Sequence, residues 1–174
     1  IAIADVLFGD FNPAVRLPFS VPRSVGQIPL YYNKKAPQSH DYVEMSASPL
    51  YPFGYGLSYT SFDYSDLHLS ALMPRSFEIS FKVRNTGKYD GEEVAQLYLR
   101  DEYASVVQPL KQLKHFARFY LKRGEEREVK FILSEEDFSL VDRNLKRIVE
   151  PGTFQIMIGA ASNDIRLQTK VEIK

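Results

Sequence analysis

The chain has 174 residues, 44% of them hydrophobic, and its 22 basic side chains balance 22 acidic ones. A formal net charge of zero provides no basic field for nucleic acid or an anionic membrane surface, and no apolar run is long enough to span a membrane. Cysteine is absent, which excludes disulfides and thiolate metal sites, and the length suits one full domain and a piece of another.

The first ten residues, IAIADVLFGD, predict the end of a helix. Ile1, Ala4 and Phe8 share one face, and Gly9 suits the residue after the helix, where a left-handed backbone is common. The stretch lacks a basic region and contains Asp5, so it does not resemble a signal peptide. Because eight residues rarely hold a helix alone, we expect the protein to continue upstream of this segment.

Residues 10–60 lack the periodic pattern of a compact unit. Asn12 and Pro13 predict a turn, and residues 15–21 an extended segment whose prolines confine it to an edge or a loop. The polar stretch NKKAPQSHD, residues 33–41, predicts an exposed loop.

From Ser61 onward, turns alternate with segments typical of β-strands. Seven strands are predicted, at residues 61–70, 76–85, 92–101, 112–121, 126–133, 152–160 and 165–174. The third reads as buried on both faces, and Ser134 with Asp137 forms a capping-box pattern that predicts one helical turn. The pattern predicts a mainly β fold, a seven-stranded antiparallel sandwich of the immunoglobulin or fibronectin type III kind, without the Cys and Trp signature of true immunoglobulin domains.

The residues that could carry chemistry do not form a recognisable site. His40, His68 and His115 have no metal-ligand spacing, so we expect no metal and no cofactor. Cleavage of a glycosidic bond needs two carboxyl groups across one cleft, but neighbours such as Glu92 and Glu93 point to opposite faces of a strand. No phosphate-binding glycine loop or serine nucleophile motif is present, so we expect no catalytic residue in this chain.

The stretch PLYPFGYGLSYT, residues 49–60, is rich in rings, prolines and glycines. We favour a linker whose side chains fill a seam between two bodies, because the stretch lies where the irregular segment ends and the strands begin. The alternative is a platform on which sugar rings stack. The residues assigned to interdomain packing are Tyr51, Phe53, Gly54, Tyr55, Gly56 and Tyr59.

Several motifs, in order, resemble the C-terminal third of family 3 glycoside hydrolases, the β-glucosidases and β-xylosidases. They are ADVLFGDFNPAVRLPFSVPRSVGQIPLYY, PLYPFGYGLSYTSF, VRNTGKYDGEEVAQLYLRD, QPLKQLKHFARFYLKRGEEREV and VEPGTFQIMIGAASNDIRL. The resemblance implies that residues 1–55 are the last piece of an α/β sandwich domain with a linker, and residues 56–174 a fibronectin type III-like domain. One departure is Asn12-Pro13-Ala14-Val15, where relatives usually carry Ser-Gly after the proline.

The same resemblance implies a role. The nucleophile and the acid/base of a retaining β-glycosidase would lie upstream, so this fragment alone is expected to be inactive and to dock onto the catalytic and α/β sandwich domains of the same polypeptide. The intact enzyme would hydrolyse terminal β-linked glucose or xylose and be periplasmic or secreted. His40, Asp41 and Tyr42 match a loop that can approach the substrate. A stand-alone β-sandwich that binds carbohydrate or protein remains the alternative.

Overall fold

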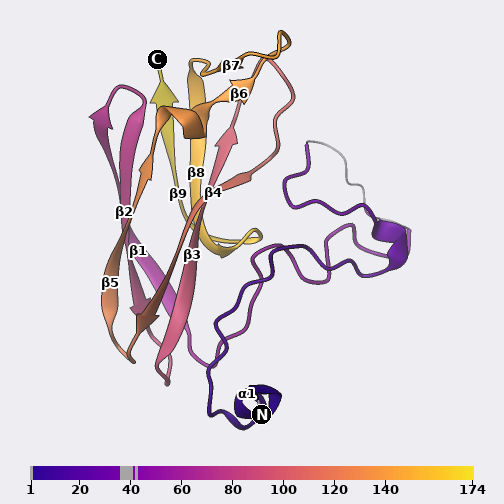
Figure 1. Ribbon diagram of the computed structural model, residues 1–174, viewed down its shortest axis with the longest axis vertical. Helices are drawn as coiled ribbons and strands as arrows, with labels where there is room; N and C mark the ends of the chain where they lie inside the picture. Colours follow the sequence, from indigo (N-terminus) through magenta and orange to yellow (C-terminus); the bar gives the residue numbers. More distant parts are fainter. Residues whose placement is uncertain (1, 36–40, 42) are drawn as a thin grey trace.

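The computed structural model describes residues 2–35, 41 and 43–174 (Figure 1). Its elements are α1 (Ala2–Phe8), η1 (Val25–Gln27), β1 (Phe62–Met73), β2 (Ser76–Asn85), β3 (Gly91–Asp101), β4 (Gln112–Leu121), β5 (Glu126–Leu133), η2 (Glu135–Phe138), β6 (Leu140–Val141), β7 (Arg147–Ile148), β8 (Gly152–Ala161) and β9 (Asp164–Ile173). Within these described ranges, no helix is long and apolar enough to cross a membrane.

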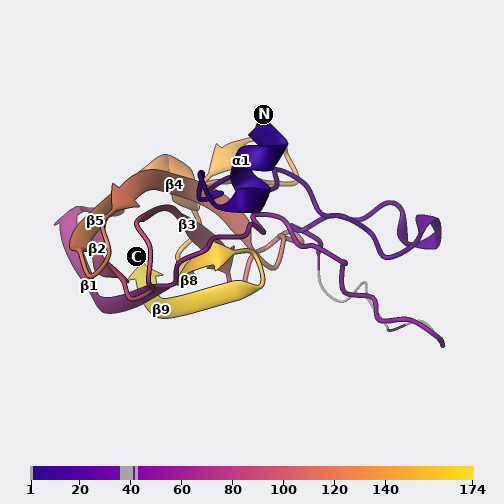
Figure 2. The ribbon, with the colours of Figure 1, turned by 90° about the horizontal axis from the view of Figure 1, so that it is seen from below.

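Seven strands form a sandwich of two antiparallel sheets, which confirms the predicted fold class. One sheet has the order β1-β2-β5 and the other β4-β3-β8-β9, and the two lie face to face (Figures 1 and 2). The sequence missed the ribbon of β6 and β7, because strands of two residues are too short to show a period. The predicted helical turn is η2, closed by the capping box of Ser134 and Asp137.

The core lies between the sheets and is built from alternate residues of each strand. Strand β2 sends Ile79, Phe81 and Val83 inward, and β8 sends Phe154, Ile156 and Ile158 from the opposite sheet. Strand β3 is buried on both faces from Glu93 to Leu99, as its sequence predicted. Its second face must therefore be covered by something outside the sandwich.

Strand β1 explains an alternation that looked imperfect in the sequence. Asp66 has a φ of +53°, and the pairing register with β2 shifts between Ser65 and His68. This bulge places one extra residue in β1, so that Tyr64 before it and Leu67 after it both pack against the core. Tyr64 and Leu67 are three positions apart, an odd offset that puts residues on opposite faces of a regular strand, so the bulge is needed to bring both to the same face.

The predicted N-terminal helix end is present as α1. Gly9 follows it with a φ of +88°, and its amide donates to the carbonyl of Val6 at 3.3 Å. After α1 the chain runs beside the four-stranded sheet, extends away from the sandwich and returns to it (Figures 1 and 2).

Candidate interdomain surface

Two stretches of the N-terminal segment pair with each other before the sandwich begins. The Leu17 amide donates to the Tyr55 carbonyl at 2.8 Å, and the Gly54 amide returns a bond to the Leu17 carbonyl at 2.8 Å. Further along, the Val21 amide donates to the Tyr51 carbonyl, also at 2.8 Å. The predicted extended segment therefore forms a short antiparallel ribbon with the aromatic stretch, hereafter the N-terminal ribbon (residues 17–21 and 51–55).

Gly54 fixes the N-terminal ribbon onto the outer face of β3. Its φ is +81°, and a Cβ at this position would lie 2.3 Å from Oε1 of Gln96. Gln96 is 3% exposed, and its Nε2 donates to the carbonyl of Ala160 at 2.6 Å and more weakly to that of Gly54 at 3.4 Å. Glycine is needed here both for the left-handed backbone and for the close approach to a buried amide.

Aromatic rings fill the space next to this contact. Tyr32 stacks on Phe53 with ring centroids 4.0 Å apart, and meets Tyr98 of β3 edge-on at 6.3 Å. The Tyr98 hydroxyl donates to Oε1 of Gln96, and burial raises the pKa of this hydroxyl. Phe53 thus packs inside the chain, at a junction of three segments far apart in sequence.

Asn12 and Arg16 hold the start of the segment. The Asn12 side chain donates to the Asp90 carbonyl at 2.9 Å, and its oxygen accepts from the Tyr59 amide at 2.8 Å. Arg16 forms an ion pair with Glu93, whose side chain is 2% exposed. Glu93 Oε1 also accepts from the Val94 amide at 2.7 Å. A buried carboxylate is held only where it is paired and hydrogen-bonded, so this contact is specific.

Glu92 and Glu93 lie on opposite faces of β3, as predicted for neighbouring strand residues, so their carboxyl groups do not share a cleft. Glu92 pairs with Arg118 of β4, with side chains 33% and 52% exposed. Glu93 points toward the inside of the sandwich and Glu92 toward the other face of the sheet, as alternate strand positions require.

The six residues assigned to interdomain packing divide between two environments. Gly54 is buried, and Phe53, Tyr55 and Gly56 are half-buried within the chain. Tyr51 and Tyr59 are 40% and 45% exposed. The stretch therefore seals a joint inside this chain, and packing against a further domain stays a prediction.

A groove of about 1190 Å³ opens beside the same stretch. It runs between residues 48–64 and the end of the sandwich, and Arg16, Arg23, Tyr55 and Arg166 contribute to its wall. Tyr51 lies against Tyr55, with ring centroids 4.9 Å apart. This open groove beside two rings is the feature that the sugar-platform alternative requires.

The loop predicted to approach a substrate is described only in part. His40 and Tyr42 lie outside the described residues. Asp41 accepts hydrogen bonds at one carboxylate oxygen from the Ala47 amide at 2.8 Å and the Ser46 hydroxyl at 3.3 Å. This is the pattern of a side chain that closes its own loop.

The two described histidines lie apart on different sheets. His68 is exposed on β1, whereas His115 of β4 stacks on Phe131 and lies 3.3 Å from a carboxylate oxygen of Asp137. Among the described residues, no group of three or more His, Asp or Glu side chains has the geometry to hold a metal ion.

The N-terminal segment exposes far more apolar surface than the sandwich. Fourteen of the twenty-four large apolar side chains that are strongly exposed in the described chain precede residue 60, although this is only the first third of the sequence. On α1, Ile3, Leu7 and Phe8 are 78%, 73% and 83% exposed. A surface of this kind is typical of an interface with another protein body.

Comparison with known families agrees with this division. Residues 1–59 match the model of the glycosyl hydrolase family 3 C-terminal domain, and residues 93–162 match the fibronectin type III-like domain. The chain belongs to the C-terminal region of family 3 glycoside hydrolases. The two matches fall on the segment that precedes the sandwich and on the sandwich itself.

Curated family 3 relatives match nearly the whole chain. A periplasmic β-glucosidase of Salmonella typhimurium is 45% identical over 95% of this chain and 23% of its own length. A β-xylosidase of Formosa agariphila is 43% identical over 97% of this chain and 24% of its own length. The chain spans about a quarter of the length of these relatives.

Solved β-glucosidase structures have the same arrangement. A β-glucosidase from Erythrobacter marinus superposes with a TM-score of 0.93 at 41% identity, over 99% of this chain and 23% of that one. A β-glucosidase from Listeria innocua, in complex with laminaribiose, superposes with a TM-score of 0.90 at 34% identity, over 99% and 26%. The path of the N-terminal segment over the sheet is therefore shared with these two β-glucosidases.

Sequence reasoning missed the polar residues that dock the segment: Asn12, Arg16, Tyr32, Glu93 and Gln96. A signal existed for two of them, since Glu93 and Gln96 are the polar residues in an otherwise apolar run of a strand that is buried on both faces. Buried polar side chains on such a strand need partners from elsewhere. Their partners lie 77 and 64 positions away, so the sequence could not identify them.

Proposed function

We propose that this chain is the C-terminal, non-catalytic part of a retaining β-glycosidase that releases terminal β-linked glucose or xylose. The observation that carries the proposal is the apolar surface before residue 60, which adjoins a β-sandwich and is exposed in the described chain. The names of the family 3 relatives, β-glucosidase and β-xylosidase, support the substrate class. The nucleophile and the acid/base would lie in preceding domains.

In this proposal the domain boundary falls near residue 55. Residues 1–55 complete an α/β sandwich domain and cross to residues 56–174, the fibronectin type III-like domain. The docking partner is the upstream part of the same polypeptide, which would cover Leu7 and Phe8 of α1 together with Tyr51 and Tyr59. Burying such side chains contributes about 25 cal/mol per Å² of apolar area removed from water.

The sandwich also contacts two residues that precede His40, Asp41 and Tyr42 in the sequence. The Leu110 amide donates to the Lys34 carbonyl at 3.0 Å, and Lys35 forms a β-bridge with Pro109. We assign these three loop residues to the neighbourhood of the substrate in the intact enzyme. The sandwich would then stiffen a loop whose tip belongs to another domain's site.

Activity measurements test the division of labour. The 174-residue chain should not hydrolyse an aryl β-glucoside or an aryl β-xyloside, whereas the intact polypeptide should hydrolyse at least one of them. Clear turnover by the purified chain alone would contradict the proposal.

A substitution on the exposed helix tests the docking surface. Leu7→Asp in the intact polypeptide should lower its melting temperature and its activity, because a charge would enter the proposed interface. Leu72→Asp on the sandwich, at a leucine that is 49% exposed, is the matched control and should change neither. Equal effects of both variants would show that α1 is not an interface.

Export to the periplasm or the medium is part of the same proposal, supported by the name of the Salmonella relative. Fractionation of cells that express the intact gene should place the activity outside the cytoplasm.

A carbohydrate-binding module is the second candidate, favoured by the groove beside Tyr51 and Tyr55. Affinity electrophoresis of the chain on cellulose, xylan and β-glucan should show retardation that Tyr55→Ala removes. Without retardation on any of the three, this candidate fails.

A further inference from the structure

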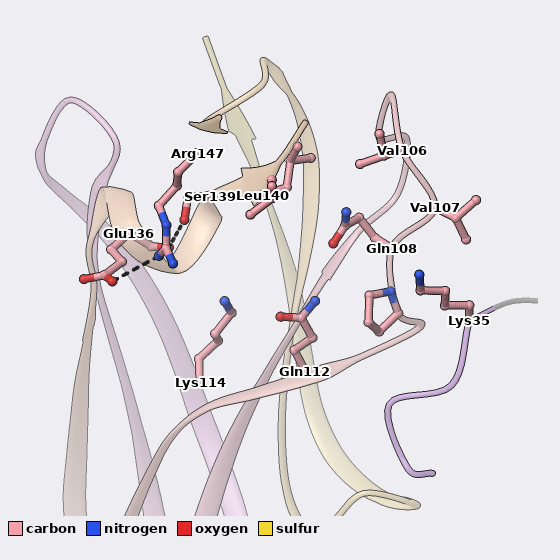
Figure 3. Close-up of a pocket in the computed structure, with 12 residues that line it drawn as sticks. Lys35, Val106, Val107, Gln108, Gln112, Lys114, Glu136, Ser139, Leu140 and Arg147 are labelled. Carbon is pink, nitrogen blue, oxygen red and sulfur yellow. Dashed lines mark hydrogen bonds and ion pairs between the residues drawn. The ribbon is translucent and has the colours of Figure 1, made fainter. Parts of the chain in front are cut away.

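A second cavity, of about 600 Å³, lies away from the N-terminal ribbon at the other end of β4. It is open to solvent and bordered by the loop before β4, the first residues of β4, and the segment from η2 to β7 (Figure 3). The side chains that line it include Lys35, Gln108, Gln112, Lys114, Leu140 and Arg147. Its volume falls within the range of about 300–1,000 Å³ typical of small-molecule sites.

A bulge in β4 brings two of these side chains to the cavity. The register with β3 shifts where Leu97 pairs with His115 and Tyr98 pairs with Leu113, so Lys114 has no pairing partner. Such a bulge redirects a side chain and bends the strand. Gln112 and Lys114 both extend into the cavity from the strand below, as Figure 3 shows.

Several polar groups in this cavity have no hydrogen-bond partner within the described chain. In the part of the chain that the structure describes, the Lys114 ammonium and the side-chain amides of Gln108 and Gln112 make no hydrogen bond or ion pair. Lys114 is half-buried, and burial is the main cause that lowers its pKa. Holding this charge away from water without an acceptor costs free energy, which a bound anion would offset.

The charges around the cavity favour an anion. Lys35, Lys114 and Arg147 line it together with one acid, Glu136. Glu136 is already engaged by Arg147 at 3.1 Å, and the nearby Asp137 is engaged by the capping box and by His115. The local excess of positive charge occurs in a chain whose formal net charge is zero.

We propose that this cavity binds a sugar unit that carries a carboxylate, a hexuronate, either free or as a branch of a polysaccharide. Lys114 pairs with the carboxylate, and the amides of Gln108 and Gln112 bind ring hydroxyl groups as both donors and acceptors. Leu140 and the neighbouring Pro109 supply an apolar surface for the face of the ring. The site is independent of glycosidic cleavage and belongs to this chain alone.

Other small ligands fit less well. Phosphate is best recognised by forked arginine contacts, and the one arginine that lines the cavity is occupied by Glu136. A neutral hexose would leave the Lys114 ammonium without a charged partner. A simple carboxylate such as acetate would leave both amides unused in a cavity much larger than itself.

Calorimetric titration of the 174-residue chain tests the proposal, with methyl β-glucuronide as the probe and methyl β-glucoside, acetate and phosphate as comparisons. The glucuronide should bind at least about tenfold more tightly than each comparison. The glucoside lacks the charge-assisted hydrogen bond to Lys114, and the two small anions lack the contacts with the two side-chain amides. Lys114→Met should weaken glucuronide binding about tenfold or more. Lys122→Met, an exposed lysine just beyond the same strand, is the matched control and should leave binding unchanged.

Gln112→Leu provides a second reading that does not depend on the charge. It should weaken the glucuronide and leave acetate unaffected. Absence of glucuronide binding, equal affinity for the glucoside, acetate or phosphate, or unchanged binding by Lys114→Met would each overturn the proposal. Thermal unfolding of both variants verifies that they are folded.

Discussion

The ion pair of Arg16 and Glu93 gives the sharpest test of how the N-terminal segment is held. Glu93 is 2% exposed and Arg16 13% exposed, and residues 17–21 follow Arg16 directly into the N-terminal ribbon. Arg16→Met keeps much of the aliphatic stem and removes the guanidinium. The variant therefore leaves a carboxylate inside the protein with the Val94 amide as its hydrogen-bond donor and the electrostatic attraction of Arg166 as the remaining charge interaction.

The expected loss of stability follows from that burial. Removing one partner of a buried ion pair costs about 3–5 kcal/mol, because the remaining charge is uncompensated. For a chain of this size such a loss lowers the melting temperature by roughly 6–20 °C. Arg118→Met breaks the pair with Glu92 next door, and because that pair is exposed it should cost at most about 1 kcal/mol.

Urea unfolding of the two variants measures the difference, and hydrogen exchange shows where it arises. In Arg16→Met, the amides of Leu17 and Gly54, which bond across the N-terminal ribbon, should exchange faster. The double variant Arg16→Met, Glu93→Leu should recover much of the lost stability, because it removes the stranded charge.

Two results would refute this reasoning. One is a loss below about 1 kcal/mol for Arg16→Met, equal to that of the exposed control. The other is a double variant that is less stable than Arg16→Met, which would mean that the carboxylate is not the source of the cost.

Three further predictions concern the contact between the N-terminal segment and the sandwich, and the residues next to it. Gly54→Ala should destabilise the chain by more than about 1–3 kcal/mol, the cost of left-handed backbone alone, because its Cβ also meets Gln96; Gly124→Ala, with a φ of +78° and open space, should show only the backbone cost in thermal unfolding. Gln96→Leu should cost about 1–3 kcal/mol in urea unfolding by leaving the Tyr98 hydroxyl without its acceptor, and recovery of wild-type stability would contradict the network. Hydrogen bonds from the Arg123 amide and, to a smaller extent, the Tyr120 hydroxyl lower the pKa of Asp90. The ionised carboxylate therefore stabilises the folded state above the unfolded pKa near 4, and this stabilisation is lost as the pH falls. The melting temperature of Asp90→Asn should lie below that of the wild type at pH 7, and the two should converge in acid.

The sandwich itself was readable from the sequence because strand burial follows a period of two. The alternation of Phe77, Ile79, Phe81 and Val83 is a local property that records which face meets the core. Strand β1, whose alternation looks imperfect in the sequence, departs from the period at the bulge around Asp66. Bulges depend on the register with a neighbouring strand, which a single segment does not encode.

The candidate interdomain surface was harder to predict from the sequence than the sandwich. The sequence indicated that rings and glycines at residues 49–60 fill a joint, and the structure shows Gly54 and Phe53 doing so against β3. It did not indicate that Tyr51 and Tyr59 are left exposed, nor that Tyr32 completes the stack.

By itself, the sequence determined the change from an irregular segment to a series of strands, the positions of seven strands and the membership in family 3, because hydrophobic period, turn residues and ordered motifs are all local patterns. Only the tertiary structure decided which polar residues come together: Arg16 pairs with Glu93, Gln96 bonds to Gly54, and Lys114 lines one cavity with Gln108 and Gln112. The physical reason is that buried polar groups are satisfied by partners brought close by the packing of sheets and segments. The sequence around one partner does not indicate which distant residue it will contact.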